Sequence, residues 1–207
     1  DFAVNDGFLP STTASKSVSV TPANDPPVLT AGATLSYTEN DPAAVIDGTI
    51  TVADPDSASI TQATVQITTN YQNGQDVLSF ATIGPISGSF VAGTGTLTLS
   101  GTDTLANYQA ALRTVKYNNT SENPSTLART VQWRATDGTD QSVVGVTSTI
   151  NVTAVNDAPV VTAGGTLNYT ENQAATAIDT TITVADPDNT NLTGATVQIT
   201  GNYANGN

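Results

Sequence analysis

Apolar and polar side chains alternate along most of this 207-residue chain. The alternation is regular in residues 49–53, 64–68, 96–100, 130–135 and 149–153. A period of two is typical of strands that bury one face in a core. Threonine fills most of the polar positions, and its branched Cβ suits a pleated strand. Short alternating segments separated by turn residues predict an all-β fold built as a β-sandwich.

One segment follows a helical pattern instead. Asp103 and Thr104 are both suitable N-cap residues at its start. The apolar side chains that recur at helical spacing are Leu105, Tyr108, Ala111 and Leu112. A further strand is expected at Val115–Tyr117. The pattern therefore predicts one short crossover helix in each unit of the sandwich.

Turn residues separate the predicted strands. Asn73-Gly74 lies between the alternating segments 64–69 and 77–80 and is typical of a hairpin turn, which needs a positive φ. Gly93-Thr94-Gly95 and Asp137-Gly138 mark two further turns. We expect a hairpin at residues 73–74.

The chain also repeats itself. Asn24–Gln75 and Asn156–Asn207 match at 35 of 52 positions, with a constant offset of 132 residues and no gap. A repeat of this kind indicates a tandem array. We expect residues 24–155 to form one complete repeat, residues 1–23 to be the C-terminal strands of a preceding repeat, and residues 156–207 to begin the following one. The joints between them, residues 22–27 and 154–159, contain proline and are short, which predicts stiff connections.

Composition narrows the possible functions. Eighteen acidic and five basic residues give a net charge of −13, which argues against binding to nucleic acid. Histidine and cysteine are absent, so the sequence offers no disulfide and neither a Ser-His-Asp nor a Cys-His arrangement. No stretch is long and apolar enough for a membrane span, so direct membrane insertion is not expected. We expect a protein that is not an enzyme.

The acidic residues recur at fixed places in the repeat. A first strand running from Asp25 to Glu39 would place Glu39 at the far pole of the sandwich. A return strand would then bring Asp54 and Asp56 back beside the joint. The first expected cluster comprises Asn24, Asp25, Asp54, Asp56 and Asp137, and the second comprises Glu39, Glu122, Asn156, Asp157, Asp186 and Asp188. The alternative is that each acid only caps a strand, because Asp and Asn favour turns.

Clustered carboxylates favour a bound cation. Like charges repel strongly where little solvent screens them. Without a counter-ion, such a cluster therefore destabilises the folded state. Oxygen ligands without histidine or cysteine favour Ca²⁺ over zinc or copper, and Ca²⁺ accepts about six to eight oxygens. Mg²⁺ prefers smaller octahedral sites that keep several waters. The sequence therefore predicts Ca²⁺ at each junction between repeats.

The ordered motifs resemble the cadherin-like repeats of large bacterial surface proteins and adhesins. The resemblance rests on the Asn24-Asp25 joint, Tyr37-Thr38-Glu39-Asn40, Ala53-Asp54-Pro55-Asp56, Ser121-Glu122-Asn123 and Arg134-Ala135-Thr136-Asp137-Gly138. It covers the complete repeat and both partial ones. The resemblance implies an Ig-like Greek-key sandwich in which these residues bind calcium between consecutive domains and stiffen the array.

These observations predict a structural spacer of a repetitive extracellular surface protein. Its partners would be the adjacent repeats of the same chain and other cell-surface molecules contacted through further domains. Two alternatives remain open: a self-assembling surface-layer or filament subunit, and a glycan-binding accessory module. Only 5% of the residues are aromatic, which disfavours a glycan platform.

Overall fold

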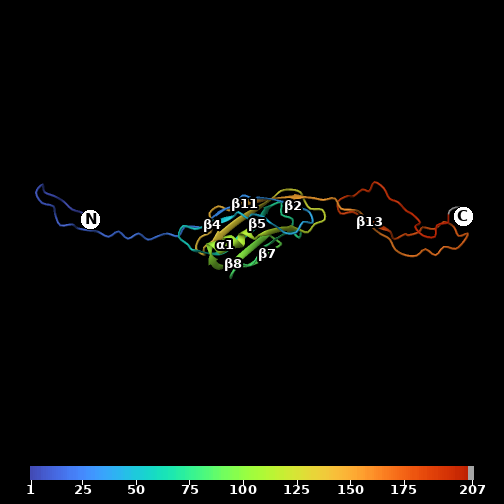
Figure 1. The fold of residues 1–207 in the computed structure, drawn as a ribbon, viewed down its shortest axis with the longest axis horizontal. Coiled ribbons are helices and arrows are strands. Elements are labelled where there is room, and N and C mark those ends of the chain that lie inside the picture. Colours follow the sequence, from blue (N-terminus) through green and yellow to red (C-terminus); the bar gives the residue numbers. More distant parts are fainter. Residues whose placement is uncertain (205–207) are drawn as a thin grey trace.

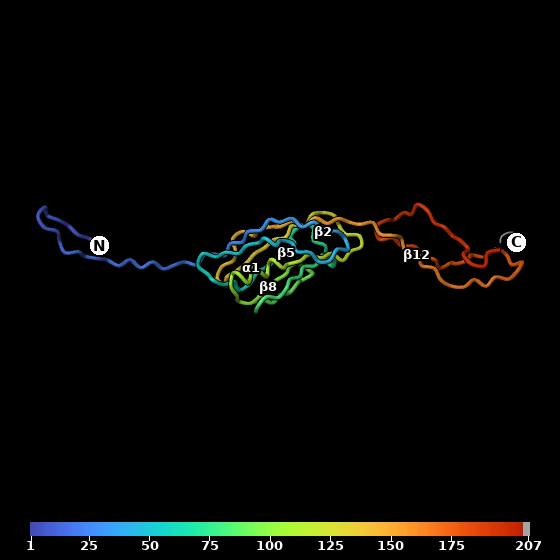
Figure 2. The backbone as a smooth tube through the Cα atoms, viewed as in Figure 1, coloured from blue at the N-terminus to red at the C-terminus, as the bar shows by residue number. Residues whose placement is uncertain are grey.

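The computed structural model describes residues 1–204. The molecule is elongated, with a compact central body flanked by one extended segment at each end (Figures 1 and 2). All residues of the hydrophobic core lie between Leu29 and Val152, and every residue from 1 to 23 is exposed. No helix in the described part of the chain has the length and apolar character needed to cross a membrane.

A six-stranded sheet forms the larger layer of the body. Its strand order is β2 (Thr34–Thr38), β11 (Val146–Thr153), β10 (Arg129–Thr136), β5 (Ser59–Thr69), β8 (Thr96–Thr104) and β7 (Ser87–Val91). Neighbouring strands are antiparallel, except that β11 and β2 pair in parallel. The predicted alternation is visible in β10, where every second residue is buried.

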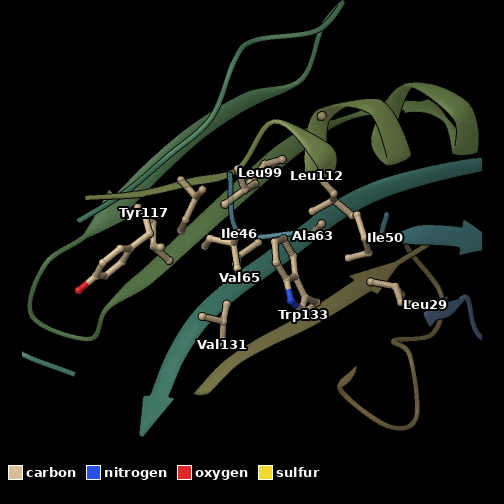
Figure 3. Packing of buried hydrophobic residues seen from close by; sticks show 14 of the residues in the cluster. Leu29, Ile46, Ile50, Ala63, Val65, Leu99, Leu112, Tyr117, Val131 and Trp133 are labelled. Atoms are coloured by element: carbon tan, nitrogen blue, oxygen red, sulfur yellow. The ribbon is translucent and has the colours of Figure 1, made fainter. Parts of the chain in front are cut away.

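Two smaller sheets close the core. One contains β3 (Ala44–Val45), β9 (Lys116–Asn119) and β6 (Asp76–Ser79), and the other pairs β1 (Val28–Thr30) with β4 (Thr51–Ala53). Apolar side chains from these three sheets gather in one cluster around Trp133 (Figure 3). The indole Nε1 donates a hydrogen bond to Ser148 Oγ at 3.0 Å, which satisfies its one buried donor. The all-β, sandwich-like architecture expected from the sequence is confirmed.

The crossover helix is also confirmed. Helix α1 (Leu105–Arg113) leads from β8 in the large sheet to β9 in the three-stranded sheet. Thr104 is its N-cap, and the Thr104 hydroxyl accepts a hydrogen bond from the backbone N–H of Asn107 at 3.2 Å. Asp103 instead accepts from the side-chain amide of Asn107 at 2.9 Å. The helix buries Tyr108, Ala111 and Leu112, as the spacing predicts.

The predicted hairpin at Asn73-Gly74 is wrong. Gly74 does have a positive φ of 83°, so the turn itself is present. The strands that flank it do not pair, because β5 lies in the six-stranded sheet and β6 pairs with β9. The turn therefore carries the chain between the sheets. The turn at residues 93–95 does join a hairpin, formed by β7 and β8.

The expected continuous first strand is also wrong. The chain forms β1 and then, after residues 31–33, β2 in a different sheet. The break is held by Asp47, whose Oδ2 accepts hydrogen bonds from the backbone N–H groups of Gly32 and Ala33, both at 3.0 Å. The chain still travels from the joint to Glu39 at the far pole, by way of two sheets.

The repeated sequence produces repeated structure in the C-terminal segment. Strands β12 (Val160–Thr162) and β13 (Thr183–Ala185) pair with the register of β1 and β4, displaced by the same 132 residues. Nearly all of residues 156–204 are exposed. The partly buried exceptions are Asp157, Asp179, Asp186 and Asp188. In this segment acids, rather than apolar side chains, are the shielded residues.

Candidate metal centre at the junction

Three carboxylates meet where the central body joins the C-terminal segment. Glu39 follows β2, Glu122 follows β9, and Asp157 lies beyond the end of β11. One oxygen from each lies within 4.8 Å of the others. Within residues 1–204, no other group of three or more acids is arranged closely enough to hold a metal ion.

Glu39 occupies the most enclosed position of the three. Its side chain is only 4% exposed. Oε2 accepts a hydrogen bond from the Val155 N–H at 2.7 Å, which ties the joint to the body. Oε1 is buried and has no hydrogen-bond partner. A buried carboxylate oxygen without a donor is costly, so Glu39 Oε1 is available as a ligand.

Asp157 is enclosed by other acids. Its Oδ2 is also buried without a partner. Burial raises the pKa of Asp157, and the negative charges of Asp188, Glu122 and Asp186 raise it further. The backbone N–H of Asp157 donates to Asp188 Oδ2 at 2.6 Å, which holds the acidic turn of the C-terminal segment against Asp157. This environment disfavours an uncompensated negative charge.

The remaining residues of the second predicted cluster lie around these three. Asp186 Oδ1 accepts from the N–H groups of Asp188 at 3.0 Å and Asn189 at 2.7 Å, so part of it serves as a turn cap. Asn156 Oδ1 accepts from the Asn189 side chain at 2.8 Å, so its amide oxygen is engaged within the C-terminal segment. The charges of Asp186 and Asp188 act on Asp157, whereas the Asn156 side-chain amide donates to the Asp157 carbonyl at 2.9 Å.

The first predicted cluster has a different arrangement. The Asn24 side-chain amide donates to Asp137 Oδ2 at 2.9 Å and to Asp140 Oδ2 at 3.0 Å. The Asp25 N–H donates to Asp56 Oδ2 at 3.1 Å. Asp54 Oδ2 is buried without a partner. These residues do share one pole, but within the described chain they form no group of three carboxylates within bonding range of one ion.

Asp140 was not anticipated from the sequence. It belongs to the turn after β10, where its N–H and that of Thr139 donate to Asp137 Oδ1. These two hydrogen bonds, and then the one from Asn24, lower the pKa of Asp137. An acid three residues after Asp137 was the available signal, but only the folded turn brings both carboxylates to Asn24.

The electrostatics of the junction fit a cation. In residues 1–204 the single salt bridge joins Arg129 to Asp76, so no basic side chain neutralises Glu39, Glu122 or Asp157. Carboxylate oxygens are hard ligands suited to a hard metal ion. The two buried unpartnered oxygens, on Glu39 and Asp157, come from opposite sides of the joint. The group can therefore hold a metal ion between the central body and the C-terminal segment.

The chain was compared with protein-family models, with curated proteins and with solved structures, and none of the three comparisons finds a match.

Proposed function

We propose that this chain is a structural spacer of a large extracellular surface protein, in which Ca²⁺ bound at each junction stiffens a tandem array. The observation that carries the proposal is the meeting of Glu39 and Glu122 with Asp157 across the joint. A metal ion held by these groups would be ligated by two consecutive units at once. Such an ion restrains their relative orientation.

Calcium is the metal that suits this set of groups best. The chain has no histidine or cysteine, and the clustered ligands are carboxylates. Ca²⁺ tolerates irregular sites of about six to eight oxygens, so carbonyl groups and waters can complete the shell. Asp186 and Asp188 lie next to Asp157 and add negative charge. The ordered motifs that resemble cadherin-like repeats support the same metal and an extracellular location.

The mechanical role follows from charge. Without a cation the carboxylates repel one another, and the joint opens to let water reach them. With Ca²⁺ bound, the repulsion is removed and both units share one set of ligands. Direct contacts already bridge the joint: besides the Val155 contact with Glu39, the Asn123 side chain donates to the Pro187 carbonyl at 3.0 Å. The metal would convert these weak contacts into a rigid connection.

Chelation tests the proposal directly. In the full chain, millimolar Ca²⁺ should lower the rate of protease cleavage at Ala154–Pro159 and reduce the flexibility seen by X-ray scattering, relative to EDTA. Glu39→Gln should abolish most of the Ca²⁺ effect, because it removes the charge of the enclosed ligand. Isothermal titration calorimetry measures the loss of affinity.

The repeat supplies a matched control. Glu171 stands in the same Tyr-Thr-Glu-Asn motif, but it is exposed and lies outside the three-carboxylate group. Glu171→Gln should leave Ca²⁺ binding at the junction unchanged. Identical cleavage and scattering in Ca²⁺ and in EDTA would refute the proposal.

A further inference from the structure

A buried carboxylate that belongs to neither predicted cluster lies at the start of β6. Asp76 is 1% exposed, and its Oδ1 accepts hydrogen bonds from the Tyr117 hydroxyl at 2.6 Å and the Asn119 side-chain amide at 2.7 Å. The guanidinium Nε of Arg129, which is fully buried, lies 3.4 Å from Asp76 Oδ2. One carboxylate thus gathers donors from β9 and from the first residue of β10.

These donors also hold the loop that carries Glu122. Asn119 Oδ1 accepts from the backbone N–H of Ser121 at 2.9 Å, at the beginning of the loop. Arg129 Nη1 donates to the carbonyl groups of Ser125 and, at 2.7 Å, of Leu127, near its end. The loop of residues 120–128 is therefore fixed at both ends by two of the three side chains that bind Asp76, namely Asn119 and Arg129.

The turn that carries Glu39 is attached to the same network. The Tyr37 hydroxyl donates to the Asp41 carbonyl at 2.7 Å, which closes that turn, and it accepts from the Asn119 N–H at 3.3 Å. The ring of Tyr37 meets the ring of Tyr117 edge to face, with centroids 5.1 Å apart. Glu39 and Glu122 follow strands of different sheets, and Asn119 contacts both of their turns, the Glu122 loop through its side chain and the Glu39 turn through its backbone N–H to Tyr37.

A buried ion pair of this kind contributes little net stability, because desolvation offsets the attraction between the charges. It does fix geometry, since each partner has to satisfy several hydrogen bonds at once. Two glutamates that repel each other need such restraint to remain in place before a cation arrives. The Asp76 network is therefore better explained as a device that positions the two glutamates than as a source of folding stability.

We propose that Asn119 and Arg129, anchored on Asp76, are positioning residues that preorganise Glu39 and Glu122 for the junction metal. This inference rests on the proposed function. Supporting groups that orient metal ligands typically change metal affinity by about 10- to 100-fold when they are removed. Removal of Asn119 should free the Glu122 loop and weaken Ca²⁺ binding without touching a ligand.

The test compares two buried polar side chains in the full chain. Asn119→Ala removes the link between Asp76 and the loop. Ser148→Ala is the control, because Ser148 is also buried but bonds Trp133 and Asp47, away from the metal centre. We expect Asn119→Ala to weaken Ca²⁺ binding by about 10-fold in calorimetry, and Ser148→Ala to leave it unchanged. In EDTA, hydrogen exchange at the Ser121 amide should accelerate in Asn119→Ala alone.

The outcomes separate this inference from the proposed function. A wild-type chain that binds no Ca²⁺ overturns both. Wild-type binding with unchanged affinity in Asn119→Ala overturns the inference alone, and so does an equal loss of affinity in both variants. If Asn119→Ala does not fold, Tyr117→Phe removes one hydrogen bond to Asp76 and keeps the ring. It should weaken Ca²⁺ binding by a few-fold, and unchanged affinity in this variant would also overturn the inference.

Discussion

Asp47 illustrates how a single charged side chain organises the junction of two sheets. It is almost fully buried, and its two oxygens accept hydrogen bonds from the N–H groups of Gly32 and Ala33, from Thr49 and from Ser148. Burial alone would raise the pKa of Asp47. The hydrogen bonds from Gly32, Ala33 and Thr49 outweigh burial and hold the pKa well below its ordinary value of 3.8.

A depressed pKa makes the contribution of Asp47 dependent on pH. The stabilisation is present above the ordinary value of 3.8 and is lost as the pH falls towards the lower pKa of the folded state. At pH 7, Asp47→Asn should lower the free energy of unfolding by about 2 kcal/mol, since hydrogen bonds to a charged acceptor are lost. The difference from wild type should shrink below pH 3.8, as measured by urea denaturation across pH.

Asp179 provides the control for this prediction. It repeats the contacts of Asp47, accepting from the Gly164 N–H at 2.9 Å and the Thr181 N–H at 2.7 Å, but it lies outside the hydrophobic core. Asp179→Asn should leave the unfolding of the central body unchanged at every pH. An equal effect of both substitutions would show that the contribution of Asp47 does not depend on its burial.

Some residues could be predicted and others could not, for a definite reason. Trp133 lies in the segment 130–135, where the alternation with period two predicts one buried face, and it is fully buried. For Asp47 and Asp76, no pattern in the neighbouring sequence indicates burial. In the sequence, an aspartate that becomes buried cannot be told from an aspartate in an exposed turn. Only the hydrogen-bond donors that distant segments supply in the folded protein distinguish the two.

At the level of elements, α1 is specified by its own sequence. Its apolar spacing and its N-cap are local features, and both are present as predicted. Thr104→Ala removes the side-chain acceptor for the Asn107 N–H. We expect a loss of about 1 kcal/mol in the free energy of unfolding. Chemical denaturation measures this, and Thr102→Ala, at an exposed position of β8, should have a much smaller effect.

The turn at Asn73-Gly74 shows where local information ends. Gly74 adopts the positive φ that its sequence favours. The choice of partner for β5 and β6 depends instead on which distant strands offer matching apolar faces. β5 lies between β10 and β8, so both of its edges are already occupied and β6 pairs with β9. A turn signal therefore predicts the bend without predicting the pairing.

At the level of the whole molecule, the two copies of the repeat match at 35 of 52 positions but differ in burial. Ile50 is fully buried, whereas Ile182, which occupies the same place in the second copy, is 52% exposed. The pairing of β12 with β13 persists because it needs only local strands. Burial needs the remaining sheets, which cover the first copy only.

This contrast gives a paired prediction. Ile50→Ala should lower the free energy of unfolding by about 3 kcal/mol, because it leaves a cavity in the core. Ile182→Ala should change it by less than about 0.5 kcal/mol, as is usual for exposed positions. Thermal and chemical denaturation of the two variants measure the difference. Similar losses would mean that the C-terminal segment is packed against a core.

The sequence by itself determined the strand periodicity, the helix and its cap, the repeat and the acids that recur in it. These features depend on neighbouring residues or on duplication, and both can be read along the chain. Tertiary structure decided which strands pair, that the first strand divides between two sheets, and that Glu39, Glu122 and Asp157 meet while the Asn156 side-chain oxygen accepts from Asn189. Those outcomes depend on contacts between distant segments, whose geometry exists only once the core has formed.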